Sequence, residues 1–215
     1  MNASPVTASV PRTSGRTSVC ATVSACAGGL LLGVLTNLAQ GWLPGAWNQI
    51  TNSGAVWSVA AFAAGALSAR RVSLAATAVA GLCAESGLVV GYYGYAEVAR
   101  DGMGSLLAPL VWLGMAFLAG PLFAVAGSWW RGIRPRRRVV GLAALAGVFG
   151  MEAIHYARVL HYVPQAWACL AVLVLVALLM GRTLRERVLT LLTALPLSVL
   201  AYLTFYATIL ATVLG

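Results

Sequence analysis

Charge is scarce in this chain. Its 215 residues include no lysine and only five acidic side chains, and charged residues of either sign make up 9% of the sequence, against 60% for hydrophobic residues. A soluble domain needs far more polar surface to face water. The hydrophobic residues come in runs of helix-spanning length, and in lipid a helix satisfies its own backbone hydrogen bonds. The composition therefore excludes an ordinary soluble protein and predicts an all-α integral membrane protein.

Side chains suited to bind a metal are also few. The sequence has two histidines and four cysteines, and none of the cysteines has CxxC spacing or a clustered histidine. The cysteines all lie inside apolar runs: Cys20, Cys26, Cys83 and Cys169. We interpret them as small buried apolar residues. No metal site and no cofactor are expected.

Seven apolar stretches are long enough to cross a bilayer. They cover residues 18–38, 53–69, 73–96, 106–130, 139–158, 164–180 and 188–215. Residues 1–17 are rich in serine, threonine and proline, and are expected to form a disordered cytoplasmic tail. Residues 18–215 are then a single transmembrane domain, a bundle of seven helices.

The basic residues are unevenly distributed. All 14 are arginines, and 12 of them lie in the tail and in the second, fourth and sixth loops, whereas only Arg100 and Arg158 lie elsewhere. The positive-inside rule then places the N-terminus in the cytoplasm and the C-terminus outside, in a multi-pass protein of the plasma membrane. Because topology explains the net charge of +9, no nucleic-acid partner is expected, and the bilayer is the partner. Arg158 is interpreted as an anchor at the membrane interface. The oligomeric state is not indicated.

Two carboxylic acids lie inside apolar stretches, Glu85 in the third and Glu152 in the fifth. An ionisable group within hydrocarbon is costly, so it usually faces a cavity or the bundle interior and has a function. Burial disfavours the charged carboxylate, and both acids are expected to hold their protons. A protonated acid can donate a proton to a substrate. The alternative is a structural hydrogen bond between helices.

Aromatic and polar side chains accompany the two acids. Glu152, His155 and Tyr156 share one helix face, and Glu85 and Tyr92 lie two turns apart on another. With the predicted orientation, these groups fall between the mid-membrane and the outer side. We expect them to line one water-poor pocket, with Glu85, Glu152 and His155 as catalytic candidates. The residues expected to bind substrate are Asn37, Trp57, Tyr92, Tyr93, Trp112, Tyr156, Tyr202 and Tyr206.

Two spacings describe how the helices meet their surroundings. Gly29, Gly33 and Asn37 recur every four residues, which predicts a close-packing helix face that ends in a polar group. Trp57, Trp112 and Trp167 recur every 55 residues, but the residues around them do not align. We therefore interpret these tryptophans as a belt at the outer interface rather than as an internal repeat.

A dry pocket with an acid floor and aromatic walls suits the cyclisation of an isoprenoid chain. The acid protonates an alkene or epoxide, and aromatic faces stabilise the resulting carbocations. In size, number of spans and paired intramembrane acids (Glu85 and Glu152), the chain resembles the small membrane-bound terpene cyclases. That resemblance implies a cofactor-independent enzyme acting on a hydrophobic isoprenoid. The family has an essential acid in its last span, whereas residues 188–215 contain none.

Two other functions fit the same features. Protonatable acids beside aromatic and amide groups also suit a small-solute carrier, or the substrate-binding membrane subunit of a transporter. A non-catalytic membrane protein, such as an assembly factor, is the third alternative.

Three segments are similar to those of an uncharacterised family of small bacterial membrane proteins. They are NSGAVW (52–57), VVGYY (89–93) and GPLFAVAGSWWR (120–131). This resemblance spans most of the chain and implies seven spans, but it assigns no function.

Overall fold

A computed structural model describes residues 15–100, 102 and 104–205, and all regular structure in this part of the chain is helical. The elements are α1 (Gly15–Trp42), η1 (Gly45–Trp47), α2 (Asn48–Thr51), α3 (Gly54–Ser68), α4 (Leu74–Ala99), α5 (Leu107–Arg131), α6 (Pro135–His155), a π-helical turn η2 (Tyr156–Leu160), α7 (Val163–Met180) and α8 (Leu184–Thr204). Within these residues, seven helical segments are long and apolar enough to cross a membrane. The predicted fold class, an all-α bundle with seven spans, is confirmed.

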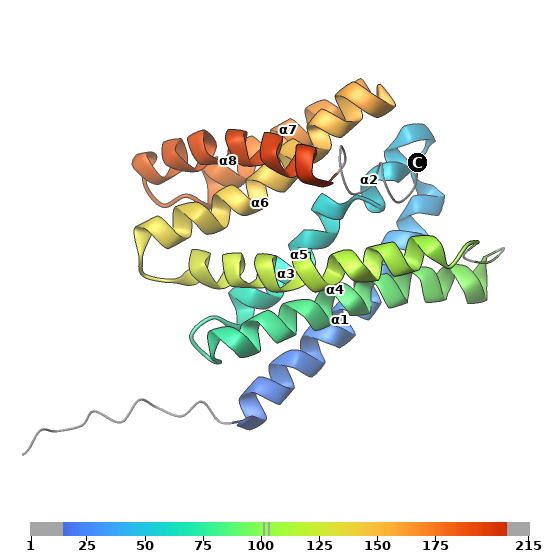
Figure 1. The fold of residues 1–215 in the computed structure, drawn as a ribbon, viewed down its shortest axis with the longest axis horizontal. Helices are drawn as coiled ribbons and strands as arrows, with labels where there is room; N and C mark the ends of the chain where they lie inside the picture. Colours follow the sequence, from blue (N-terminus) through green and yellow to red (C-terminus); the bar gives the residue numbers. More distant parts are fainter. Residues whose placement is uncertain (1–14, 101, 103, 206–215) are drawn as a thin grey trace, which may run out of the picture.

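Successive long helices run in opposite directions (Figure 1). The connections α3–α4, α5–α6 and α7–α8 gather at one end, which we call the arginine-rich end because ten arginines lie in or beside them. The other connections gather at the arginine-poor end, where Arg100 and Arg158 lie. The arginines thus separate as the sequence predicts, and the assignment of the arginine-rich end to the cytoplasm stays a prediction.

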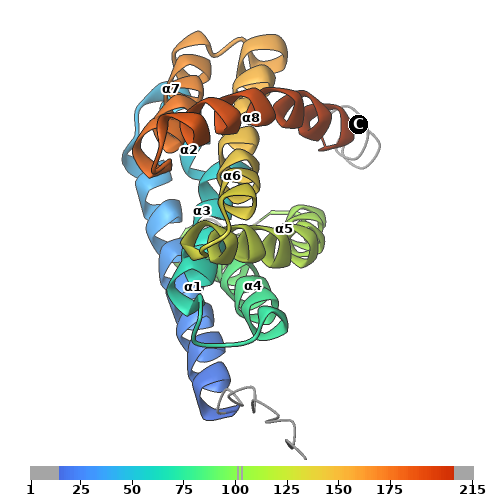
Figure 2. The ribbon, with the colours of Figure 1, turned by 90° about the vertical axis from the view of Figure 1, so that its left-hand side faces the viewer.

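The centre of the bundle is formed by α3 and α5, each of which packs against both α4 and α6. Helix α1 packs mainly along α4, and α7 and α8 pack against α6 (Figure 2). Most of α6 is buried, whereas α1 and α8 leave most of their surface exposed. Because α3 and α5 lie between α4 and α6, the two acid-bearing helices do not pack along one another.

Glycines let α1 and α4 approach until their backbones touch. The buried residues of α1 are Gly29, Gly33 and Asn37, so the predicted close-packing face is confirmed. A Cβ atom at Gly33 would overlap the Leu88 carbonyl oxygen, and one at Gly91 would overlap that of Leu30. Small residues at such contacts give dispersion contact over a long stretch, which holds transmembrane helices together where lipid supplies no hydrophobic drive.

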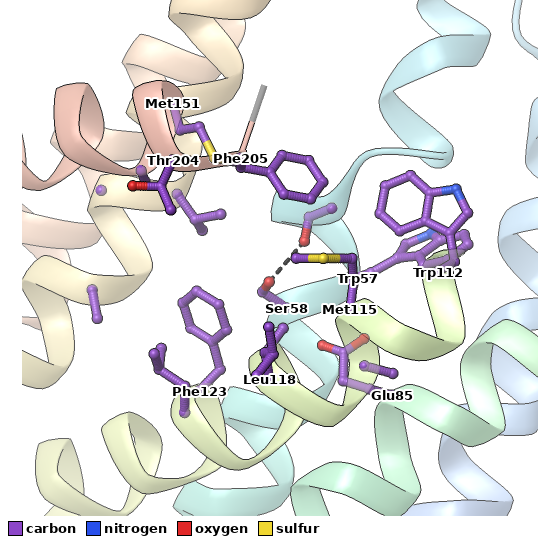
Figure 3. Close-up of a pocket in the computed structure, with 18 of the residues that line it drawn as sticks. Trp57, Ser58, Glu85, Trp112, Met115, Leu118, Phe123, Met151, Thr204 and Phe205 are labelled. Atoms are coloured by element: carbon purple, nitrogen blue, oxygen red, sulfur yellow. Dashed lines mark hydrogen bonds between the residues drawn. The ribbon is translucent and has the colours of Figure 1, made fainter. Parts of the chain in front are cut away.

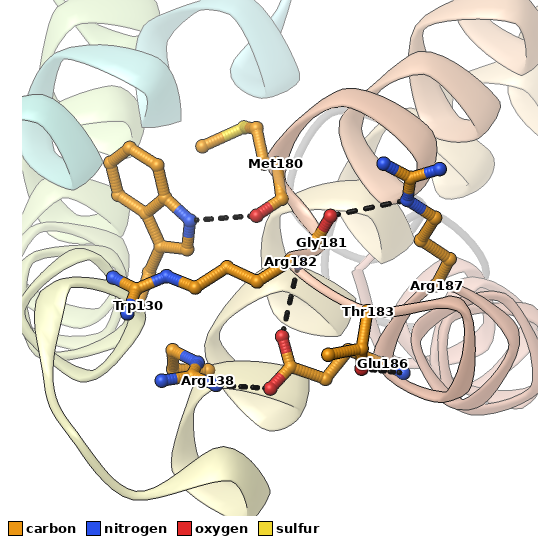
Figure 4. Close-up of polar contacts among 8 residues, drawn as sticks. All are labelled: Trp130, Arg138, Met180, Gly181, Arg182, Thr183, Glu186 and Arg187. Carbon is orange, nitrogen blue, oxygen red and sulfur yellow. Dashed lines mark hydrogen bonds and ion pairs between the residues drawn. The ribbon is translucent and has the colours of Figure 1, made fainter.

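An ion pair joins α6 to α8 at the arginine-rich end (Figure 4). Arg138 and Glu186 are both buried, and the second oxygen of Glu186 accepts a hydrogen bond from the Arg182 N–H at 3.1 Å. The Trp130 indole N–H donates to the Met180 carbonyl oxygen at 3.2 Å and so ties α5 to the end of α7. Arginines that the sequence shows only as topology signals therefore also brace the loops.

Several predicted boundaries differ from the structure by a few residues. Helix α1 begins at Gly15, so residues 15–17 of the predicted tail are helical, while residues 1–14 lie outside the described residues. Helix α6 begins at Pro135 rather than at residue 139, because proline suits the first helical position and the helix extends through arginines beyond the apolar run. Helix α8 likewise begins at Leu184 rather than at residue 188, and the last stretch is described as far as residue 205.

Candidate functional site

A cavity of about 430 Å³ lies among α3, α4, α5, α6 and α8 (Figure 3). Its described lining is apolar apart from three side chains, Ser58, Glu85 and Thr204. The Ser58 hydroxyl donates to the Gly54 carbonyl oxygen at 2.7 Å, and the Thr204 hydroxyl donates to that of Leu200 at 2.8 Å. Both hydroxyls are therefore engaged by their own helices. Glu85 is the one ionisable group among the described lining residues.

Glu85 projects from the middle of α4 and is 3% exposed. Its Oε1 atom is buried and has no hydrogen-bond partner among the described residues. Figure 3 shows its carboxyl group beside Met115 of α5. Helix α4 is held in this rotation because Gly81 meets the backbone of α5, and Gly87 that of α1. An unsatisfied polar group in an apolar site costs stability, so the Oε1 atom of Glu85 adds no stabilising hydrogen bond to the described part of the fold.

Aromatic rings form the wall near Glu85. Trp57 of α3 and Trp112 of α5 have ring centroids 5.1 Å apart, and the Trp112 and Phe205 centroids are 6.3 Å apart. The Trp57 indole N–H donates to the Thr51 carbonyl oxygen at 2.9 Å, which fixes its ring. Trp57 is only 2% exposed, so its interpretation as part of an interfacial belt is wrong; Trp167, at 68% exposure, fits that interpretation.

Within the described residues, the cavity opens sideways between α5 and α8. Its lining includes Leu118 and Leu122 of α5 and Leu200 of α8, and more than half of each of these side chains is exposed. The exposed surface of a transmembrane helix faces lipid. A molecule dissolved in the bilayer can therefore reach the cavity without crossing water.

Glu152 is buried but does not line this cavity. Its Oε1 atom accepts a hydrogen bond from the Ala55 N–H, at 3.4 Å, in the first turn of α3. The free N–H groups of a helix N-terminus carry partial positive charge, which favours a carboxylate there. Gly54 lies between Glu152 and the cavity. The expected chamber shared by Glu85 and Glu152 is therefore not formed, because α3 begins between the two acids.

The side chains around Glu152 belong to the same junction. Tyr156 is 2% exposed and lies beside Ser53, the residue that caps α3. His155 is half-buried, with its ring centroid 6.3 Å from that of Tyr156. Tyr156 and His155 do not line the cavity. They surround the start of α3.

Asn37 and Tyr92 connect α1 to α4. The Asn37 amide donates to the Tyr92 carbonyl oxygen at 3.0 Å, and the Tyr92 hydroxyl donates to the Gln40 side chain. The Arg100 guanidinium donates to the Asn37 carbonyl oxygen at 2.5 Å. The Tyr92 ring lies behind Trp57, at 5.3 Å between centroids. Asn37 and Tyr92 thus lie outside the cavity, and Tyr92 supports its wall.

The remaining predicted tyrosines lie elsewhere. Tyr93 packs edge-on against Tyr92, with 5.0 Å between ring centroids. Tyr202 lines a second groove, on the far side of α8. Tyr206 lies outside the described residues. Of the predicted site residues, the cavity therefore brings together Glu85, Trp57 and Trp112.

Several lining residues have no conspicuous sequence signal. Met115 and Ala119 lie one and two turns after Trp112 on α5, so the helical period could have found them once Trp112 was placed in the wall. Phe123 follows one turn later. Met151 and Phe205 look like ordinary apolar span residues, and only the packing of α6 and α8 brings them to the cavity.

Fold and site together define a multi-pass, all-helical membrane protein whose apolar cavity contains one buried acid. The chain belongs to a family of unknown function, DUF6518, whose model matches residues 12–211. The predicted membership of an uncharacterised family is thereby confirmed. No curated protein and no solved structure matches the chain.

Proposed function

We propose that this protein takes a neutral isoprenoid substrate from the bilayer and cyclises it, with Glu85 as the proton donor. The observation that carries this proposal is a buried carboxyl group, with one oxygen lacking a partner among the described residues, facing an apolar cavity that opens to lipid. An ionisable residue inside the membrane that serves no structural contact is a functional candidate.

The chemistry of the lining favours a neutral, hydrophobic substrate. No arginine or histidine lies among the described residues that line the cavity, so these residues offer no cation to a phosphate or diphosphate. The engaged hydroxyls of Ser58 and Thr204 offer little to a polar solute. These features favour a lipid-soluble substrate over the small solute of a carrier.

Residues that line the cavity can perform each step of the proposed cyclisation. The Glu85 O–H bond breaks and its proton adds to an epoxide oxygen or a terminal alkene carbon, which leaves a carbocation on the substrate. The electron pair of a neighbouring alkene forms the new carbon–carbon bond, while the ring faces of Trp57 and Trp112 stabilise the moving positive charge. The last cation returns a proton to the Glu85 carboxylate. The product is an isomer of the substrate, and no cofactor is consumed.

The test is conversion of prenylated indoles, prenylated quinones and their terminal epoxides by the purified protein in liposomes. We expect products of unchanged mass and altered chromatographic retention. Glu85→Gln removes the acidic proton at constant volume and should abolish conversion. Glu97→Gln, on the exposed end of the same helix, is the matched control and should convert normally.

Two results would refute the proton-donor role. One is full conversion by Glu85→Gln, and the other is the absence of conversion of every probe by the wild-type protein. Glu152→Gln separates the two acids: because Glu152 does not line the cavity, the folded variant should keep its activity. The plasma membrane as location and a cytoplasmic N-terminus belong to the same proposal. Membrane fractionation tests the location, and accessibility of a cysteine placed in each loop tests the orientation.

A further inference from the structure

A second groove, of about 710 Å³, lies at the arginine-poor end of the bundle and shares no lining residue with the Glu85 cavity. It is formed by the end of α6 with η2, the start of α7 and the end of α8. Its polar or amphipathic side chains are Arg158, Trp167 and Tyr202, and the remainder of its described lining is aliphatic.

The side chains of this groove become less polar with increasing depth in the membrane. Arg158 lies in the last turn before the α6–α7 connection, whereas Ile154 lies one turn deeper on the same face. On α7, Trp167 lies nearer that connection and Leu170 lies deeper. The groove therefore has a cation at its outer edge, aromatic rings at the headgroup level and aliphatic walls below, which is how amphipathic residues distribute at a bilayer surface.

Arg158 is available to a ligand. It is exposed, and the buried ion pair between Arg138 and Glu186 lies at the opposite end of the bundle. The turn that carries Arg158 is π-helical, a rare form that is frequent at functional sites. His161 follows this turn, and its φ of 56° is unusual for a residue other than glycine.

We propose that this groove binds one anionic phospholipid of the surrounding bilayer. The phosphate pairs with Arg158, whose planar guanidinium donates in the fork geometry that phosphate oxygens accept. An acyl chain lies between Trp167 and Tyr202 along the aliphatic walls. The single cation at the edge favours an anionic lipid over a zwitterionic one, and the aliphatic groove below it favours a lipid over a free phosphate ion.

The experiment is photo-crosslinking of the purified protein with phosphatidylglycerol that carries a photoreactive acyl chain, compared with the matched phosphatidylcholine. Peptide mapping reports labelling of residues 153–170 and 199–202. One basic residue at the surface is expected to favour the anionic lipid about fivefold. Arg158→Gln should equalise the two lipids, and Arg158→Lys should keep most of the preference.

Arg185→Gln is the matched control, because Arg185 is an exposed arginine at the arginine-rich end. It should leave labelling of the groove unchanged. Equal labelling by the two lipids in the wild-type protein would overturn the assignment, as would a preference that survives Arg158→Gln. Lipid labelling of the wild-type protein and of the Arg158 variants does not depend on cyclisation at Glu85. The lipid-binding proposal can therefore be tested independently of the proposed function.

Discussion

Replacing Glu85 by methionine is expected to stabilise the protein while abolishing the proposed conversion. The side chain is 3% exposed, and its Oε1 atom has no partner among the described residues. Methionine has a similar length, fills irregular apolar spaces and needs no hydrogen bond. The substitution therefore removes the desolvation cost of the carboxyl group and leaves its packing in place. Such opposite effects on stability and activity are typical of functional residues.

The expected gain in stability of Glu85→Met follows from the one carboxyl oxygen that has no hydrogen-bond partner among the described residues. A buried polar group without a hydrogen bond costs about 1–3 kcal/mol in mutational studies. Because the acid borders a cavity, the lower part of that range applies, and we expect a gain of about 1–2 kcal/mol in unfolding free energy. For a chain of this length each kcal/mol raises Tm by about 2–4 °C.

The assay is thermal unfolding in detergent, followed by the circular dichroism of the helices, together with the conversion of prenylated probes. Glu97→Met is the matched control, since this exposed acid lies on the same helix; its Tm should change by less than that of Glu85→Met. If Glu85→Met unfolds at a lower temperature than the wild-type protein, Glu85 makes a stabilising contact. The reasoning that assigns it to function rather than to the fold would then be wrong.

Three further substitutions test the framework of the site by the same unfolding measurement. Glu152→Leu should lower the unfolding free energy by about 1–3 kcal/mol, the opposite sign to the variant above, because the start of α3 loses a buried acceptor; an increase would contradict its structural role. Gly33→Ala should cost about 1–3 kcal/mol through overpacking against α4, whereas Gly28→Ala, where a Cβ meets no atom within 4 Å, should be neutral or slightly stabilising; equal effects would contradict the close contact. Glu186→Gln should cost about 1–3 kcal/mol, because Arg138 loses its counter-charge but keeps an amide oxygen as acceptor near the end of the bundle. Replacing Arg138 and Glu186 together by methionine should recover much of the lost unfolding free energy, because no buried charge is then left without a partner. If the double variant is no more stable than Glu186→Gln, the ion pair itself stabilises the fold.

The helices could be predicted from the sequence because the thickness of a bilayer sets the length of an apolar run. Helix ends were less predictable, since α6 extends through its arginines to Pro135, a continuation that hydrophobicity does not record. The face of α1 that carries Gly29 and Gly33 was predictable from their spacing, because the helical period places both on one side.

The site was only partly predictable. Glu85 stood out as an acid in an apolar run, and so did Glu152, but equal depth in the membrane does not determine the direction in which a side chain points. The start of α3 at Gly54, between the two acids, decides that Glu152 meets backbone N–H groups while Glu85 meets a cavity. Met151, the residue before Glu152, lines the cavity instead, and its identity gave no signal.

The gap between α5 and α8 determines which concentration governs occupancy of the Glu85 cavity. Because exposed leucines of both helices border the opening, a ligand is drawn from the hydrocarbon phase. Its saturation should follow the mole fraction of ligand among lipids rather than its amount per volume of buffer. Adding inert lipid at constant protein and ligand should therefore lower occupancy, whereas diluting the whole suspension with water should leave it unchanged.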